Sequence, residues 1–478
     1  MTSEQASIPS AVPGLRWPAF PGRADARILA EQWQRAHPAC RQTAAADDTA
    51  LLLALQWQLE RSEWSSPDVL PARQLVQLDA LLAHAWREVP FYRARLECAG
   101  YRPDVSLTWS VFQRIPILPR SEVQTTGPGL RARAWPTQHG KAYRETTSGS
   151  TAEPVEFAST DVVKVMWHAL TVREHLWHRR DFGGRLAAIR SVIDPGDRPD
   201  WGLPAILLGE TGPAFGLRVS TPIPQQAAWL RERDPEYLLS YPSNVAALAR
   251  EFIARGDRLT RLREARTFGE RLPAELRDLV RRAWNVPVVD VYSAQEVGHI
   301  ALQCPQHTHY HVQSENVVVE VLDDKGAPSP AGTVGRVVVT SLHNFATPFI
   351  RYELGDYAEP GEPCDCGRGL PVLRHVVGRA RNMAVLPDGS RFWPRIRPGE
   401  WADVVAVKEF RLVQTAPDAM RLEIVTQQPL HAGQTAALAA GVARHLAHPF
   451  RVSVLGVDRI VRGAADKLDD FLCEVHCR

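Results

Sequence analysis

The stretch Val286-Pro-Val-Val-Asp-Val-Tyr-Ser-Ala-Gln-Glu296 is the most informative part of the chain. Its first seven residues are mostly apolar and β-branched, which predicts a buried strand followed by polar groups. Further strands are predicted over residues 317–322 and 335–342, and a third apolar run ends at Asp356. Ligands often bind at the ends of the strands of a sheet. Glu296 and Asp356 are carboxylates at such strand ends, so they are candidate site residues.

Length and composition set the broad class of the protein. The chain has 478 residues, of which 45% are hydrophobic and 23% charged, as expected for a soluble protein with two or three domains. A net charge of +2 argues against nucleic-acid binding. No apolar run approaches the roughly 20 residues of a membrane span, and the N-terminus lacks the order of a secretory signal. We therefore expect a cytoplasmic protein with no membrane or nucleic-acid partner.

The N-terminal part is predicted to be an irregular arm up to about residue 45, followed by packing helices near residues 50–57 and 75–86. The middle of the chain alternates strand and helix patterns, which favours a largely parallel sheet. One short strand there leads into a helix over 244–255, with Ser243 as the expected N-cap. Strand ends on one edge of such a sheet bind ligands, so Ser240, Tyr241, Gly269 and Glu270 are candidate pocket walls.

The segment Thr146-Thr-Ser-Gly-Ser-Thr151 gathers five hydroxyl side chains around one glycine. Hydroxyls and backbone N–H groups in such a loop can wrap phosphate oxygens. The segment is not a Walker A motif, because no Gly-Lys-Ser/Thr follows at the required spacing. Taken by itself, it fits an ordinary turn at least as well.

Three of the seven cysteines, Cys304, Cys364 and Cys366, are grouped with a His-rich stretch that follows Cys304. An odd number of scattered cysteines argues against a disulfide framework. Three thiolates and one imidazole suit a tetrahedral structural zinc site. The choice among the histidines rests on the family resemblance described below, which implies His311 as the first choice for the fourth ligand and His309 as the second. The alternative is three reduced cysteines in loops.

Seven motifs in this order resemble the adenylate-forming superfamily, and most of all its phenylacetate-CoA ligase and coenzyme F-adenylating branch. They are the loop 146–151 and the segments 241–243, 268–270, 290–296, 340–342, 350–356 and 378–379. The resemblance implies an α/β fold, with a large adenylate-forming domain of mixed sheets and helices and a small mobile α+β C-terminal domain. The implied borders are 1–70 for the arm and first helices, 71–378 for the AMP-binding domain with its zinc-knuckle loops, and 379–478 for the lid.

The resemblance also implies a site that binds ATP and Mg²⁺. Glu296 corresponds to the family's magnesium ligand, Asp356 to its ribose anchor, and Lys467 to its catalytic lysine. The implied nucleotide-binding residues are Thr147, Ser148, Gly149, Ser150, Thr151, Gly269, Glu270, Tyr292, Asp356 and Arg379. The implied catalytic residues are Lys467, Glu296 and Thr147, and the implied substrate pocket contains Tyr241, Ser293 and Ala294.

Lysine is rare in this chain, with only five against an arginine-rich background, which supports a special role for Lys467. Lys408 is the fallback. The sequence departs from the family pattern in four places: Glu153 stands where a lysine is frequent, the pair Ser293-Ala294 adds bulk, Asn382 replaces a hinge aspartate, and Asp466 replaces the glycine before Lys467.

The activity implied is ATP-dependent conversion of a carboxylic acid, favoured to be aromatic, into an acyl-adenylate, followed by transfer to coenzyme A. A carrier-protein thiol or an amine would use the same first half-reaction. A homodimer is compatible with the sequence. The alternative of another class is a non-catalytic, nucleotide-binding and zinc-stabilised partner protein.

Overall fold

The computed structural model divides into two compact units. The first contains Met1–Gly184, Arg198–Ala214 and Val291–Val377, and the second contains Arg185–Asp197, Phe215–Asp290 and Gly378–Arg478. The residues described are 16–38, 47–147, 154–379, 382–394, 396, 401, 404–426, 428–446, 448–461 and 470–475. The borders expected at 70/71 and 378/379 stay a prediction. Within these ranges no helix combines the length and the apolar character that crossing a membrane requires.

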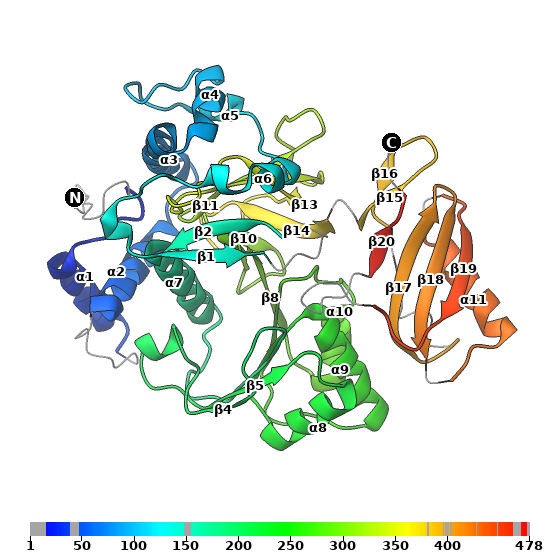
Figure 1. Cartoon of the computed structure of the whole chain (residues 1–478). Coiled ribbons are helices and arrows are strands. Elements are labelled where there is room, and N and C mark those ends of the chain that lie inside the picture. Colours follow the sequence, from blue (N-terminus) through cyan, green and yellow to red (C-terminus); the bar gives the residue numbers. More distant parts are fainter. Residues whose placement is uncertain are drawn as a thin grey trace. The chain divides into compact units, whose positions relative to one another are not determined.

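Helices open the first unit (Figure 1). They are α1 (Arg23–Ala36), α2 (Asp47–Ser62), α3 (Val69–Glu88), α4 (Pro90–Cys98), α5 (Trp109–Arg114), α6 (Arg120–Thr126) and, after the hairpin of β1 (Ala142–Thr146) and β2 (Glu156–Thr160), α7 (Asp161–Trp177). Short 3-10 turns occur at Gly127–Leu130, Thr137–His139 and Ala205–Leu207. The helices predicted near residues 50–57 and 75–86 are confirmed as parts of α2 and α3.

The expectation of an irregular N-terminal arm is wrong for α1. Ala26, Ala30 and Trp33 recur four and three residues apart, so they share one helix face, and all three are buried in a core with residues of α2 and α7. The Trp33 Nε1–H donates to Glu60 Oε1 at 2.8 Å. The Pro/Ala-rich composition of the surrounding segment hid this short apolar stripe.

The strands of the first unit are neighbours in the order β11-β12-β13-β14-β10-β9-β8, and the pairs described among them are antiparallel. Their bounds are β8 (Val288–Ala294), β9 (Gly298–Gln303), β10 (Tyr310–Val312), β11 (Val317–Leu322), β12 (Gly335–Ser341), β13 (Tyr352–Pro360) and β14 (Val372–Arg379). The three predicted strands are confirmed as β8, β11 and β12. The border between the two units falls within β8, because residues up to Asp290 belong to the second unit and those from Val291 to the first.

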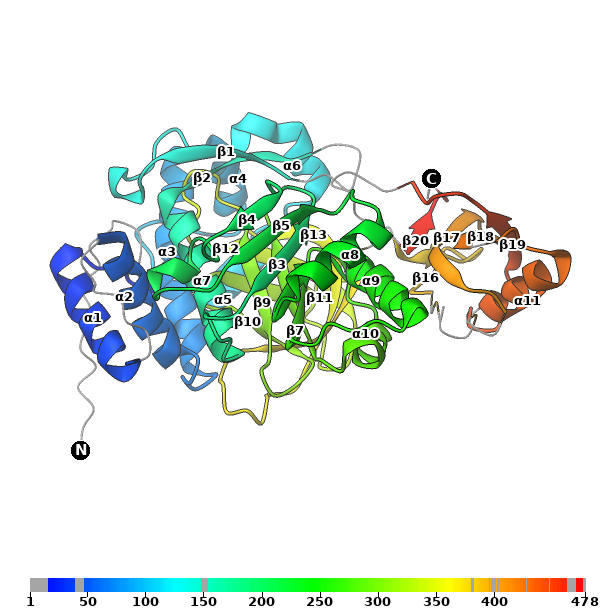
Figure 2. The same ribbon diagram turned by 90° about the horizontal axis from the view of Figure 1, so that it is seen from below.

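The second unit contains the predicted parallel strands. β6 (Tyr237–Ser240) pairs in parallel with both β3 (Leu186–Arg190) and β7 (Glu264–Phe268). The remaining elements of this part are β4 (Gly196–Arg198), β5 (Ala214–Arg218), α8 (Ile223–Arg233), α9 (Pro242–Arg255) and α10 (Leu276–Trp284). Their apolar faces share one core, and Figure 2 shows the three helices in green.

The N-cap expected at Ser243 is wrong. Helix α9 begins two residues earlier than expected, at Pro242, with Tyr241 as its N-cap. Proline suits the first helical position because the N–H it lacks would have no partner inside the helix. Ser243 lies in the first turn, where its N–H and its hydroxyl donate to the two oxygens of Glu270 at 3.0 and 3.1 Å.

The C-terminal part of the second unit has the predicted α+β character. A four-stranded sheet in the order β19-β18-β17-β20 carries helix α11 (Figure 2). The bounds are β15 (Ala384–Val385), β16 (Arg391–Phe392), β17 (Val407–Ala416), β18 (Ala419–Thr426), α11 (Ala432–Ala443), β19 (Arg451–Gly456) and β20 (Phe471–Cys473). Leu412, Leu422 and Leu438 are fully buried in its core.

Candidate functional site

Glu296 lies in the turn between β8 and β9 and is the centre of a buried polar cluster in the first unit. Arg120, the first residue of α6, donates from Nη1 to Glu296 Oε1 at 3.0 Å. The Tyr352 hydroxyl, at the start of β13, lies 3.3 Å from the same oxygen and accepts from Arg120 Nη1 at 3.0 Å. Only 5% of Glu296 is exposed. Three segments far apart in sequence therefore converge on one carboxylate.

Thr147 joins this cluster at the point where the Ser/Thr/Gly loop begins. Arg120 Nη2 donates to Thr147 Oγ1 at 3.3 Å, and the backbone N–H of Val155 donates to the same oxygen at 2.9 Å. The Thr147 N–H donates in turn to the Val155 carbonyl at 3.0 Å. The two ends of the loop are thus held together. Ser148, Gly149, Ser150 and Thr151 lie outside the described residues, as does Glu153.

The electrostatics of the cluster keep Arg120 positively charged. Burial lowers the pKa of its guanidinium, but contact with Tyr352 and Glu296 outweighs that effect and raises the pKa overall. Burial, followed by the neighbouring Glu296, raises the pKa of the Tyr352 hydroxyl, which stays protonated and can donate. The cluster therefore presents a fixed cation beside a carboxylate.

Tyr292 and Asp356 form a second polar contact in the first unit. The Tyr292 hydroxyl, on β8, donates to Asp356 Oδ2 at 2.9 Å on β13. Gly355, directly before the aspartate, has φ +80°, a conformation that a side chain would strain. Ser293 and Ala294 complete β8 and are half-buried. The Asp356 carboxylate is also half-buried, so it is held in place while part of it stays accessible.

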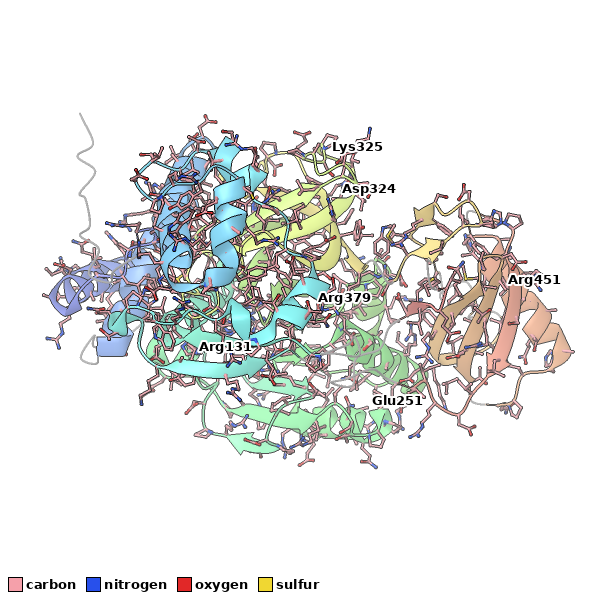
Figure 3. All side chains as sticks on the ribbon, turned by 45° about the horizontal axis from the view of Figure 1, so that its top comes forward. Arg131, Glu251, Asp324, Lys325, Arg379 and Arg451 are labelled. Carbon is pink, nitrogen blue, oxygen red and sulfur yellow. The ribbon has the colours of Figure 1, made fainter. Side chains whose placement is uncertain are left out.

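Several of the predicted site residues belong to the second unit. Tyr241 is buried, accepts or donates a 2.7 Å hydrogen bond with Ser191 Oγ, and packs on Phe268 with ring centroids 5.0 Å apart. Gly269 has φ +77°, and Glu270 accepts the two bonds from the first turn of α9. Arg379 ends β14 and is labelled in Figure 3.

The predicted catalytic Lys467 lies outside the described residues. Its fallback, Lys408, is exposed on β17. The role of either lysine stays a prediction.

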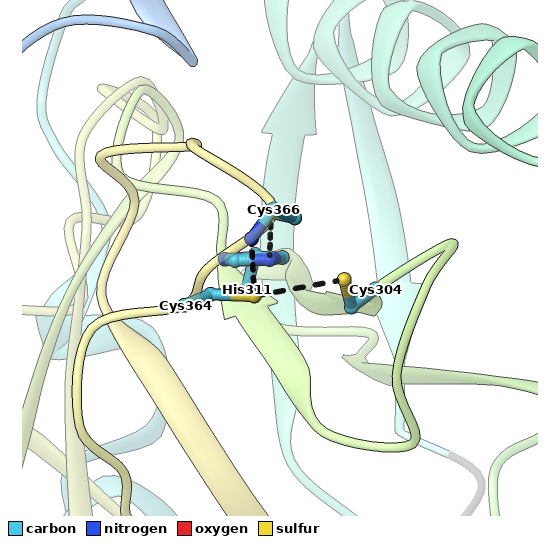
Figure 4. A group of neighbouring side chains, drawn as sticks. All are labelled: Cys304, His311, Cys364 and Cys366. Carbon is cyan, nitrogen blue, oxygen red and sulfur yellow. Dashed lines mark hydrogen bonds between the residues drawn. The ribbon is translucent and has the colours of Figure 1, made fainter.

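The four predicted zinc ligands lie together in the first unit. One ligand atom from each of Cys304, His311, Cys364 and Cys366 is within 4.8 Å of every other (Figure 4). Cys304 and His311 are buried. His309, the second choice for the fourth ligand, is not a member of this group; its ring instead stacks on His307 at 5.0 Å.

Comparison with known proteins finds no family model that matches the chain. A phenylacetate-coenzyme A ligase of Thermus thermophilus is 27% identical over 343 residues, which cover 66% of this chain and 72% of that protein. A phenylacetate-coenzyme A ligase of Escherichia coli K12 is 24% identical, with coverages of 69% and 75%. The chain is similar to phenylacetate-coenzyme A ligases over about two thirds of its length.

Solved structures agree on the fold. A 2-hydroxyisobutyryl-CoA ligase in the postadenylation state, in complex with R3-HIB-AMP, superposes with a TM-score of 0.67 at 21% identity and covers 87% of this chain and 92% of that one. The same ligase with 2-HIB-AMP and CoA in the thioesterification state gives a TM-score of 0.57 at 20% identity. The predicted α/β fold of the adenylate-forming CoA ligases is confirmed.

Sequence reasoning missed Arg120, the residue that joins Glu296, Tyr352 and Thr147 in one cluster. It is 176 residues from Glu296 and 27 from Thr147 in the chain. The protein has 56 lysines and arginines, nearly all arginine, so one more arginine carries no local signal. Arg120 is the first residue of a short helix, directly after Pro119, and its local sequence does not distinguish it from the other arginines.

Proposed function

We propose that this protein uses ATP to convert a carboxylic acid into an acyl-adenylate and then transfers the acyl group to coenzyme A. The observation that carries the proposal is the convergence of Arg120, Thr147, Glu296 and Tyr352 at the start of a Ser/Thr/Gly loop. The similarity of the chain to phenylacetate-coenzyme A ligases indicates the reaction in which this polar cluster takes part. The same relatives, and the packing of Tyr241 on Phe268, favour an aromatic acid.

Phosphate binding is assigned to Thr147, Ser148, Gly149, Ser150 and Thr151, with Arg120 as their cation. Glu153 stands where relatives of this type often have a lysine, so the loop itself lacks a positive charge. The half-buried Arg120 supplies one beside Thr147. A preorganised cation of this kind stabilises negative charge that develops on phosphate oxygens during transfer.

Magnesium is assigned to Glu296. Among the described residues, the hydrogen bonds to this side chain end on Oε1, which leaves Oε2 for a hard cation. Bound there, Mg²⁺ would neutralise charge on the phosphates. Arg120 and Tyr352 hold the carboxylate in one orientation whether or not the ion is present.

The remaining assignments place the nucleoside and the acid. Asp356 anchors the ribose hydroxyls and is oriented by Tyr292. Gly269, Glu270 and Arg379 contribute to nucleotide binding, and Tyr241, Ser293 and Ala294 line the acid pocket. Lys467 neutralises charge between the carboxylate and the α-phosphate as the adenylate forms. The reaction needs no covalent enzyme nucleophile.

Coenzyme A is the proposed acceptor, and a carrier-protein thiol or an amine is the alternative. The cytoplasmic location and the homodimer stay predictions.

Acid-dependent exchange of labelled pyrophosphate into ATP tests the first half-reaction. A panel of aryl and short aliphatic acids should show exchange with at least one aryl acid, and chelation of Mg²⁺ should abolish it. Absence of exchange with every acid, in a folded protein that still binds ATP, would favour the non-catalytic alternative. Thioester formation with coenzyme A, compared with a carrier protein and with an amine, then identifies the acceptor.

A further inference from the structure

We propose that Cys304, His311, Cys364 and Cys366 hold one Zn²⁺ ion, which stabilises the fold and takes no part in the reaction. Cys304 follows β9, His311 lies on β10, and the two other cysteines lie in the loop between β13 and β14. The proposal does not depend on the acyl-transfer function.

The spacing of the ligand atoms fits a tetrahedral site. With Zn–S near 2.3 Å and Zn–N near 2.0 Å, two ligand sulfurs should lie about 3.8 Å apart, and a sulfur and a nitrogen about 3.6 Å apart. Cys304 Sγ and Cys364 Sγ are separated by 3.9 Å, and Cys366 Sγ and His311 Nε2 by 3.4 Å. The sulfurs are well beyond the roughly 2.0 Å of a disulfide bond. The four groups are therefore spaced around a point rather than bonded to one another.

The ligands are also held in orientations that suit a metal. The His311 Nδ1–H donates to the Leu370 carbonyl at 3.3 Å, which leaves the Nε2 lone pair facing the sulfurs. The backbone N–H of Gln306 points at Cys304 Sγ at 3.5 Å, and that of Cys366 points at Cys364 Sγ at 3.4 Å. Such donors stabilise thiolates, the form of cysteine that binds zinc.

A charge balance adds an independent argument. Three thiolates, one neutral imidazole and one Zn²⁺ carry a net charge of −1. Arg368 lies beside them, with Nη1 3.7 Å from Cys366 Sγ and Nε 3.2 Å from Glu63 Oε1. Its guanidinium is held 4.4 Å from the ring centroid of Trp177 and 4.7 Å from that of Trp64. A fixed, buried cation beside the cluster compensates the charge that zinc binding would leave.

The site would connect elements that are distant in sequence. β10 pairs with both β9 and β14, so the ion would join the loops at the ends of three neighbouring strands. The Gly369 N–H donates to the Glu63 carbonyl at 2.9 Å, which attaches the cysteine loop to the segment after α2. Four protein ligands leave no open position for substrate, as is typical of structural zinc sites.

A rival set shares Cys364 but adds His307 and Asp365. The Asp365 side chain is 83% exposed, and the pair already forms a hydrogen bond of 2.5 Å between His307 Nε2 and Asp365 Oδ1. It offers one sulfur ligand instead of three. Zinc favours the set with three thiolates.

Metal analysis of the full chain, purified without chelators, should find about one zinc per chain, and Co²⁺ substitution should give the intense visible absorption of a tetrahedral thiolate site. Zinc content far below one per chain, with no uptake of added Zn²⁺ or Co²⁺ by the reduced protein, would overturn the proposal.

Variants locate the site. Cys366→Ser and His311→Gln should lose zinc, whereas Cys98→Ser, at an exposed free cysteine, and His307→Gln should keep it. If the ligand variants do not fold, Arg368→Met should still fold and should lower zinc affinity about tenfold in competition with a chelator. Equal zinc content and affinity in all of these variants would refute the assignment, and loss on His307→Gln alone would transfer the ion to the rival set.

Discussion

The hydroxyl of Tyr292 and the Oδ2 atom of Asp356 are 2.9 Å apart, so a tyrosine of β8 orients a carboxylate of β13 from 64 residues away. The contact joins two motifs that sequence resemblance treats as separate. It also restricts the rotation of the proposed ribose anchor before a nucleotide arrives, which reduces the entropy lost on binding.

This contact predicts different effects for its two partners. Asp356→Ala should raise KM for ATP about tenfold to a hundredfold, because it removes hydrogen bonds to a charged acceptor. Tyr292→Phe should raise it only a few-fold, since the carboxylate stays but is less well oriented. Pyrophosphate exchange at varied ATP concentration measures both. Equal KM values for the wild type and Asp356→Ala would contradict the assignment.

Glu296→Gln should reduce the exchange rate about a hundredfold or more, because the amide keeps the shape of the side chain but is a poor magnesium ligand. A high Mg²⁺ concentration should restore only part of the lost exchange rate. Thermal unfolding serves as the control, since loss of the Arg120 ion pair also affects stability. An exchange rate near that of the wild type would show that the metal binds elsewhere.

Two substitutions of Arg120 separate the contribution of its positive charge from that of its hydrogen-bonding geometry. Arg120→Met should lower kcat for adenylation about a hundredfold, because the cation beside Thr147 is removed and Glu296 is left without its partner. Arg120→Lys should recover part of that loss, since it restores the charge but cannot reach Glu296 and Thr147 at once. Two variants with equal kcat would mean that the charge is unimportant.

Lys467→Ala should abolish acyl-adenylate formation yet leave thioester formation from a presynthesised adenylate largely intact. The reason is that an ammonium is needed only while charge develops between the carboxylate and the α-phosphate. Single-turnover assays of each half-reaction separate the steps. Equal loss in both would indicate misfolding or another role, and unchanged adenylation would move the assignment to Lys408.

His343 should make the protein less stable in mild acid. Its Nε2–H donates to the Glu315 carbonyl at 2.7 Å, and burial lowers its pKa to about 4. The unfolded chain binds a proton near pH 6.5 and the folded one only near pH 4. The stability from this residue is therefore complete above pH 6.5 and is lost as the pH falls toward 4, by on the order of 3 kcal/mol.

The variant His343→Gln keeps a donor for the Glu315 carbonyl but cannot be protonated. Urea unfolding at pH 7.5 and pH 5 should show a smaller loss of stability in this variant than in the wild type. The same loss in both proteins would assign the acid sensitivity to other groups.

Local sequence patterns predicted much of the fold, whereas the roles of the site residues stay predictions. The apolar, β-branched residues of 286–292 and 317–322 predicted β8 and β11, because such side chains favour an extended backbone. Apolar residues spaced three and four positions apart predicted α2 and α3. The short stripe of α1 escaped notice, since 14 residues in a Pro/Ala-rich region give a weak signal.

Only the tertiary structure showed which of these residues meet. The three cysteines suggested a metal site and the family resemblance favoured His311, but the meeting of Cys304, His311, Cys364 and Cys366 depends on the pairing of β10 with β9 and β14. Arg120 carries no pattern of its own, and its position beside Glu296 results from packing between segments 176 residues apart. Sequence determines local conformation through neighbouring residues, whereas a site of converging charges is decided by contacts that form only when the chain is folded.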